Sequence, residues 1–216
     1  MKTQKFDWLR WAVHAGALIT FAVLAIRYFT GNLSVNPIQT LEQQTGKTAL
    51  IFLMLSLACS PLGAILGWRE LTGRKKALGL YGFTFAAIHL LIYIGLDFGF
   101  QFKFIFKALL NSVYLWVGLA AFLILLALAV TSFKKMKLLL KKNWKRLHRL
   151  VYILSPLVVL HYILTLKNNF VSLQGNITEP LIYGGIVLLL LILRIPPIKT
   201  TLTSLRIRLQ NRRLPV

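Results

Sequence analysis

The sequence of 216 residues is poor in acidic side chains and in cysteine. Five aspartates and glutamates stand against 26 lysines and arginines, which gives a formal net charge of +21. The single cysteine, Cys59, cannot form a disulfide within one chain or supply the four thiolates of an iron–sulfur cluster. Because there is no Cys-x-x-Cys-His motif, covalent attachment of a c-type haem is excluded as well.

Long polar stretches are also scarce, since 57% of the residues are hydrophobic and the mean hydropathy is +0.69. Six apolar runs are each close to the ~20 residues that cross the hydrocarbon core of a bilayer. They cover residues 8–27, 48–67, 77–96, 110–133, 149–166 and 180–195. No internal repeat with a period of 20–50 residues is visible. The sequence therefore predicts an all-α polytopic membrane protein, in which residues 1–216 form one domain, a six-helix transmembrane bundle.

The basic residues are concentrated in alternate connections between these runs. If the N-terminus is cytoplasmic, 21 of the 26 lie on the inner side, eight of them in residues 134–149. The outer side then keeps Arg27, Lys47, Lys103, Lys107 and Lys167. This bias places both termini in the cytoplasm. This one-sided distribution explains the high net charge without binding of nucleic acid, because basic residues on the inner side attract the anionic lipids of the membrane. An alternative role for the inner basic residues is a docking surface for an acidic cytoplasmic electron donor.

The first 47 residues consist of residues 1–27, which contain the first apolar run, and a predicted outer loop, 28–47. Each of these two segments allows two interpretations. Residues 1–27 are interpreted as a retained span rather than a signal peptide, since His14 and flanking arginines interrupt the apolar run. In the predicted outer loop 28–47, Asn36 can cap a short helix that begins at Pro37. That helix would rest its apolar side on the membrane or on a partner, or else the segment is a connecting loop with one capped turn.

Two histidines lie inside apolar runs at nearly equal depth. His89 and His161 are each about 12 residues, or about 18 Å, from the cytoplasmic start of their runs. A charged side chain at such a depth costs roughly 2.5–3.5 kcal/mol, whereas a neutral imidazole bound to a metal avoids this. Two imidazoles at one depth suit the two axial positions of a haem iron. We therefore expect both as iron ligands, in the outer half of a ~30 Å core.

Small residues follow one face of the run that contains His89. Gly79, Gly82, Ala86 and His89 are spaced by 3, 4 and 3 residues, which places them on one helical stripe. Such a stripe leaves room for a porphyrin edge, and it is also typical of close helix packing in membranes. We interpret Gly79 and Gly82 as part of a cofactor-binding slot.

The remaining histidines raise the question of a second site. His148, at the inner end of the fifth run, does not share a helical face with His161. It is a possible ligand of a second haem, with His14 as a candidate partner, or it contacts a propionate, a flavin phosphate or a quinone. Tyr93 and Tyr162 are candidates for hydrogen bonds near the iron ligands, or members of an aromatic belt.

Two other classes of function remain open from these residues alone. One is a metal or proton transporter that uses the two buried histidines, although such paths usually need buried carboxylates and the chain has few acids. The other is a scaffold subunit in which the histidines only pack. A visible absorption spectrum separates both from an electron carrier.

Three blocks of sequence carry a family resemblance. Asn36-Pro37-Ile38, residues 74–80 continuing to His89, and residues 144–152 continuing to His161 resemble the MsrQ (YedZ) family. This family is a branch of the ferric reductase-like transmembrane proteins, and the resemblance covers nearly the whole chain.

The resemblance implies an electron-transfer subunit, rather than the catalytic one, in a bacterial inner membrane. It would bind haem b, one group or possibly two, and pass electrons to a periplasmic molybdopterin-dependent reductase that repairs methionine sulfoxide in oxidised proteins. The quinone pool or a cytoplasmic flavin reductase is the implied donor, and FMN is implied by resemblance only. Relatives with two stacked haems commonly have four histidine ligands, whereas Lys75 stands near the fourth position here.

Overall fold

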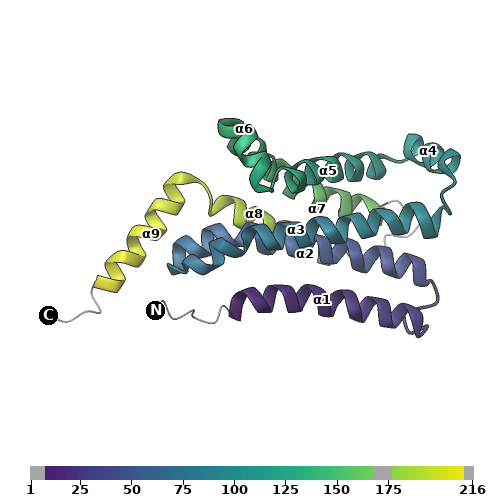
Figure 1. The fold of residues 1–216 in the computed structure, drawn as a ribbon, viewed down its shortest axis with the longest axis horizontal. Helices are drawn as coiled ribbons and strands as arrows, with labels where there is room; N and C mark the ends of the chain where they lie inside the picture. The colour runs from purple at the N-terminus through teal and green to yellow at the C-terminus, as the bar shows by residue number, and fades with distance from the viewer. Residues whose placement is uncertain (1–7, 168–176, 212–216) are drawn as a thin grey trace.

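The computed structural model describes residues 8–167 and 177–211, and every regular element in these ranges is helical (Figure 1). The elements are α1 (Trp8–Phe29), α2 (Pro37–Leu66), α3 (Arg69–Ile92), α4 (Phe102–Asn111), α5 (Val113–Val130), α6 (Lys134–Leu147), α7 (Val151–Lys167), α8 (Thr178–Ile192) and α9 (Pro196–Asn211). A π-helical turn, Tyr93–Asp97, prolongs α3, and a 3-10 turn, His148–Leu150, joins α6 to α7.

Five of the six predicted spans form helices that are long and apolar enough to cross a membrane. The sixth differs, because α8 ends at Ile192 and α9 leaves it at an angle of 78°. Pro196 and Pro197 explain the break, since proline has no N–H for the helix ladder and disfavours helical geometry in the residue before it. With α8 and α9 taken as one bent span the count is six. The predicted all-α polytopic membrane fold is confirmed.

The helix α2 begins earlier than its hydropathy predicted. The Asn36 side chain accepts a hydrogen bond from the Gln39 N–H at 3.2 Å, and Pro37 occupies the first turn. The predicted helix start at Asn36 and Pro37 is therefore confirmed. The predicted helix length and the alternative of a connecting loop are wrong, because this start belongs to a continuous helix of 30 residues. Polar residues at 42–48 hid this continuity, although Leu41 is buried and packs in a cluster with Leu33 and Ile92.

The core is centred on α2, which lies against α3 along most of its length and also contacts α1, α7, α8 and α9 (Figure 1). Gly67, with φ of 72°, ends α2 in the left-handed conformation that glycine adopts without strain, and α3 runs back antiparallel. On the other side α5 and α7 form a second close pair. Leu57 and Leu154 are the largest side chains to be almost fully buried, one in each pair.

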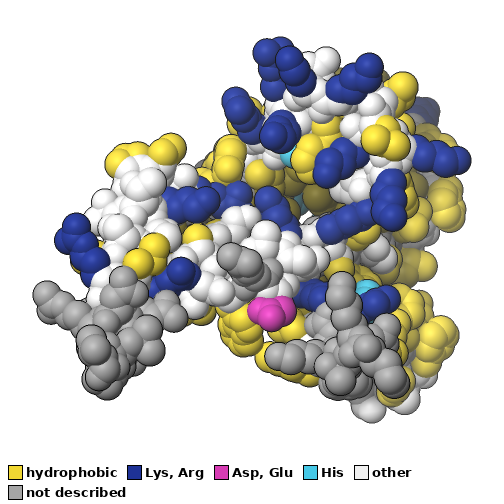
Figure 2. All heavy atoms as spheres, turned by 60° about the vertical axis from the view of Figure 1, so that its left-hand side comes forward, with side chains coloured by type: hydrophobic (Ala, Val, Ile, Leu, Met, Phe, Trp, Pro, Cys, Tyr) yellow, Lys and Arg dark blue, Asp and Glu magenta, His cyan; other side chains and the backbone are white. Residues whose placement is uncertain are grey.

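One end of the bundle is strongly basic. The α2–α3 turn, α6 and the α8–α9 bend lie at this end, and we call it the basic end (Figure 1). Lysine and arginine side chains gather over it in Figure 2. The connection between α1 and α2, the π-helical turn and α4 lie at the opposite end.

The predicted outer loop 97–109 is wrong as a loop, since most of it forms α4. This helix is amphipathic: Phe102 and Phe106 are exposed on one side, and Lys103 and Lys107 lie on another. Ser112, with an extended backbone (φ −135°, ψ 109°), separates α4 from α5, so the fourth span is shorter at both ends than residues 110–133.

Candidate functional site

The fold brings the imidazoles of His89 on α3 and His161 on α7 close together in the bundle, with their planes nearly perpendicular. Their ring centroids are 6.3 Å apart and their planes are inclined by 79°. A metal–imidazole bond of about 2.0–2.1 Å, with about 1.1 Å from each ring nitrogen to its centroid, predicts about 6.3 Å for two rings on opposite sides of one metal. The separation of the two rings therefore fits two axial ligands of one ion.

Each imidazole is oriented by a backbone carbonyl of a neighbouring helix. His89 Nδ1 donates to the Glu42 carbonyl oxygen on α2, and His161 Nδ1 donates to the Tyr114 carbonyl oxygen on α5, both at 2.9 Å. A carbonyl only accepts, so Nδ1 carries the proton in each ring and Nε2 keeps its lone pair. This is the tautomer that ligates a metal, with the second-shell hydrogen bond that fixes ring orientation.

A glycine lies against each ring, and no motif in the sequence predicts a role for either glycine. A Cβ at Gly118 would lie 2.6 Å from His161 Cε1, and a Cβ at Gly46 would lie 3.3 Å from His89 Nδ1. Each glycine comes four residues after the residue whose carbonyl holds the ring. In an α-helix the residue at i+4 stands over the carbonyl of residue i, so a side chain there blocks the approach of an imidazole.

The assignment of Gly79 and Gly82 to a porphyrin slot is corrected by the structure. A Cβ at Gly79 would lie 3.3 Å from Ser56 Oγ, and one at Gly82 would lie 3.4 Å from the Ala49 carbonyl oxygen. Both glycines thus face α2, and Ser56 also donates to the Lys75 carbonyl on α3 at 2.8 Å. The stripe mediates close packing of α2 and α3, which was the other interpretation of its spacing.

His148 and His14 have separate surroundings. His148 lies between α5 and α6, where its Nε2 is 3.2 Å from Thr131 Oγ1 and its ring centroid is 4.2 Å from that of Trp144, with the planes inclined by 31°. His14 Nδ1 is 2.6 Å from the Tyr81 hydroxyl at the contact of α1 with α3. The structure does not give these two histidines a common partner. Within the described residues no group of three or more His, Cys, Asp or Glu forms a candidate metal site.

The two tyrosines near the ligands make no hydrogen bond to either imidazole. The Tyr93 hydroxyl is buried without a hydrogen-bond partner, and the Tyr162 hydroxyl donates to Glu179 Oε2 at 3.0 Å. Lys47 Nζ contacts the same carboxylate oxygen at 2.7 Å. The backbone carbonyls therefore take the role that these tyrosines were expected to have.

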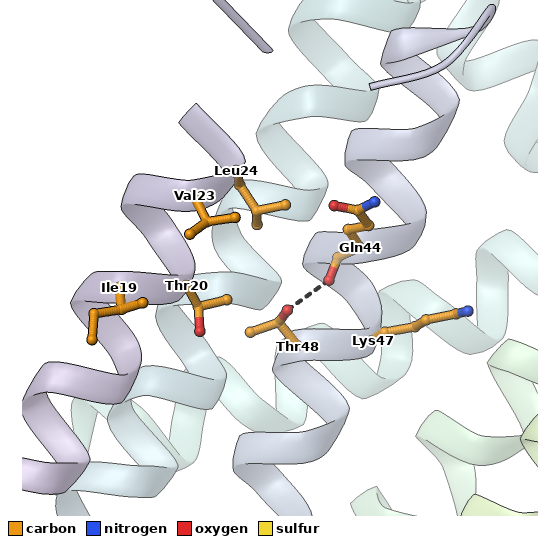
Figure 3. Close-up of a pocket in the computed structure, with 7 residues that line it drawn as sticks. All are labelled: Ile19, Thr20, Val23, Leu24, Gln44, Lys47 and Thr48. Atoms are coloured by element: carbon orange, nitrogen blue, oxygen red, sulfur yellow. Dashed lines mark hydrogen bonds between the residues drawn. The ribbon is translucent and has the colours of Figure 1, made fainter. Parts of the chain in front are cut away.

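A groove of about 350 Å³ lies between α1 and α2, apart from the histidine pair (Figure 3). It is lined by Ile19, Thr20, Val23, Leu24, Gln44, Lys47 and Thr48. Thr48 donates to the Gln44 carbonyl at 2.7 Å, and Lys47 extends away from α1. The groove reflects the loose contact of α1 with the rest of the bundle.

Comparison with known proteins identifies two levels of similarity. Residues 45–159 match the family described as ferric reductase like transmembrane component. The chain is 40% identical to the protein-methionine-sulfoxide reductase heme-binding subunit MsrQ of Rhodospirillum rubrum over 87% of this chain and 88% of that protein. It is 37% identical to the protein of the same name from Xanthomonas euvesicatoria, over 83% and 82%. No solved structure matches.

Proposed function

Because the chain belongs to the MsrQ family within the ferric reductase-like transmembrane proteins, we propose that it holds haem b between His89 and His161 and carries electrons across the bacterial membrane. The single observation that carries this proposal is the pair of opposed imidazoles, 6.3 Å apart, each with Nδ1 bonded to a backbone carbonyl. When bound, the haem supplies a one-electron couple.

The chain's own residues provide a preorganised pair of neutral ligands. The Glu42 and Tyr114 carbonyls hold the Nδ1 protons, so neither ring has to change tautomer when a metal arrives. Phe85 lies one turn before His89 on α3 and is buried in an apolar cluster, and burial in apolar surroundings is one of the factors that set a haem potential.

We further propose that the acceptor is a periplasmic molybdopterin-dependent methionine sulfoxide reductase. Its support is the relatives' name as subunits of a protein-methionine-sulfoxide reductase, together with the position of the histidine pair. His89 lies about 12 Å from the end of the π-helical turn at Asp97, measured along the helix, and His161 about 9 Å from Lys167. If the basic end is cytoplasmic, the pair lies nearer the periplasm.

The same proposal includes an electron donor and further cofactors. A quinol or a cytoplasmic flavin reductase would deliver electrons, and His148 near the basic end is the candidate ligand for a second haem. FMN is carried over from the family resemblance alone. Pyridine-haemochrome quantitation, with fluorescence of acid-released flavin, gives the haem type, the number of haems and the flavin content per chain.

The test is a visible spectrum of the purified protein with three matched variants. The wild type should show a low-spin b-type spectrum that sharpens on reduction by dithionite. His89→Ala and His161→Ala should each abolish it, whereas His14→Ala, which changes a histidine at the contact of α1 with α3, should retain it. A colourless, folded wild type would contradict the proposal and leave an intramembrane histidine transporter as the better explanation.

A further inference from the structure

The two halves of the histidine site repeat each other with a constant offset. His89 bonds the carbonyl of a residue 47 positions earlier, and so does His161. In both halves a glycine follows that residue by four positions and lies against the ring. All three members of the first half, Glu42, Gly46 and His89, therefore recur 72 residues later as Tyr114, Gly118 and His161.

The same offset aligns other residues of the helices without a gap. The identical pairs between residues 42 and 89, besides Gly46/Gly118 and His89/His161, are Ala49/Ala121, Leu53/Leu125, Ser60/Ser132, Leu66/Leu138, Arg74/Arg146 and Leu78/Leu150. The pairs Ala49/Ala121 and Leu53/Leu125 are buried in both copies. With the glycines they are spaced by three and four residues, so each set lies on the inner face of its helix, α2 or α5.

The turn between the helices falls within two residues of a backbone break in the second copy. The α2–α3 turn is made by Gly67 and Trp68, just before Arg69. At the offset of 72, Arg69 corresponds to Lys141, the one residue inside α6 with a non-helical backbone (φ 46°, ψ −119°). At the basic end the second copy has a longer connection than the first. Its first helix, α5, stops at Val130, and α6 then leads the chain back to α7.

We propose that α2–α3 and α5–α7 are two copies of one helical hairpin, each holding one axial imidazole, and that Gly46 and Gly118 are equivalent positioning residues. The inference rests on the proposed function. Neither glycine touches the metal; each keeps the carbonyl four residues earlier open to a side chain from the other helix of its hairpin.

The two copies differ in how tightly the glycine and the ring pack, which sets the order of the effects. At Gly118 an added methyl would overlap the ring, so His161 has to move and its bond to the Tyr114 carbonyl lengthens or breaks. At Gly46 the clearance is 3.3 Å, and a displacement of a few tenths of an ångström suffices. Alanine at either position otherwise favours the helix over glycine.

The experiment compares Gly118→Ala and Gly46→Ala with Gly73→Ala and Gly185→Ala, where an added Cβ meets nothing within 4 Å. Readouts are the haem dissociation constant, the low-spin electron paramagnetic resonance spectrum, which responds to ring orientation, and the thermal unfolding temperature. We expect at least tenfold weaker haem binding and an altered spectrum for Gly118→Ala, a smaller change of the same kind for Gly46→Ala, and wild-type behaviour for the two controls. An unchanged Gly118→Ala, or a larger effect of Gly46→Ala, would overturn the inference.

A haem-free measurement separates this inference from the proposed function. With only four histidines in the chain, nitrogen-15 spectra of histidine-labelled protein report the tautomer of each ring. The hairpin inference requires Nδ1-protonated His89 and His161 in the wild type, and loss of that state for His161 in Gly118→Ala. If the tautomers agree with this requirement but no haem binds, the proposed function fails and the hairpin inference stands. If haem binds but Gly118→Ala leaves the tautomer of His161 unchanged, the hairpin inference fails and the proposed function stands.

Discussion

Glu179 at the start of α8 connects α2, whose Glu42 carbonyl orients His89, with α7, which carries His161. Its carboxylate accepts from Lys47 Nζ at 2.7 Å and from the Tyr162 hydroxyl at 3.0 Å. Lys47 directly follows Gly46, which lies against His89, and Tyr162 directly follows His161. We therefore predict that Glu179→Gln loosens the spacing of the two imidazoles, although residue 179 touches neither.

The size of the effect follows from exposure. Lys47 and Glu179 are 32% and 38% exposed, so the ion pair contributes about 0.2–1 kcal/mol, the range of surface pairs. The hydrogen bond from Tyr162 changes from a charged to a neutral acceptor, which removes about 1 kcal/mol. Together they amount to about 1–2 kcal/mol, or roughly a 5–30-fold loss of haem affinity if all of it is coupled to binding.

The assay is haem transfer to an excess of apomyoglobin, for the wild type, Glu179→Gln, Glu179→Asp and the control Glu70→Gln. Glu70 is an exposed carboxylate in the first turn of α3 at the basic end. Glu179→Asp keeps the charge and should lose less haem than Glu179→Gln. Raising the salt concentration should narrow the difference between Glu179→Gln and wild type, because the pair is partly exposed. Equal haem release by wild type and Glu179→Gln, or an equal effect of Glu70→Gln, would refute the reasoning.

Three further outcomes are expected. His148→Ala should keep most of the haem absorbance yet slow reduction by the donor in stopped flow, and complete loss of absorbance would contradict its separate placement between α5 and α6. Charge reversal at Lys103 or Lys107, on exposed faces of α4, should change haem oxidation by the purified partner at low salt, whereas reversal at Lys142 on α6 should not. Asn36→Ala removes the cap of α2 and should lower the free energy of unfolding by about 1 kcal/mol in a denaturant titration.

The long helices could be predicted from hydropathy, and the meeting of His89 with His161 from their depth in the membrane. Both predictions depend on the thickness and polarity of the bilayer. Five apolar runs form long helices, and equal depth alone anticipated that His89 and His161 would meet. Depth constrains position along the membrane normal but not rotation about a helix axis. For that reason depth does not predict which neighbour the stripe of Gly79 and Gly82 faces. From the sequence a porphyrin was expected against the stripe, and the structure places α2 there.

Errors in the connections had a different origin. A hydropathy average cannot separate a polar loop from the polar first turns of a long helix. The apolar run therefore begins at residue 48, although the helix begins at Pro37, where the capping residues indicated a start. The same average merged α4 with the connection before the fourth span, since Phe102 and Phe106 alternate with lysines at helical spacing. In both places the capping and extended residues, Asn36 and Ser112, mark the true boundaries.

The residues that orient the imidazoles were missed because a backbone carbonyl has no sequence signature. Glu42 and Tyr114 have unlike side chains, an acidic one and an aromatic one, yet each provides a backbone carbonyl oxygen in the same position. The arrangement does require two residue types in the sequence. One is a glycine, one helical turn after the residue whose carbonyl accepts the hydrogen bond, and the other is a histidine on the second helix of the hairpin. That requirement appears as glycine and histidine 43 residues apart, first as Gly46 and His89 and again 72 residues later. The period exceeds the 20–50 residues of common repeats, and it becomes visible only when each ring is matched with the helix that it contacts rather than with the helix that carries it.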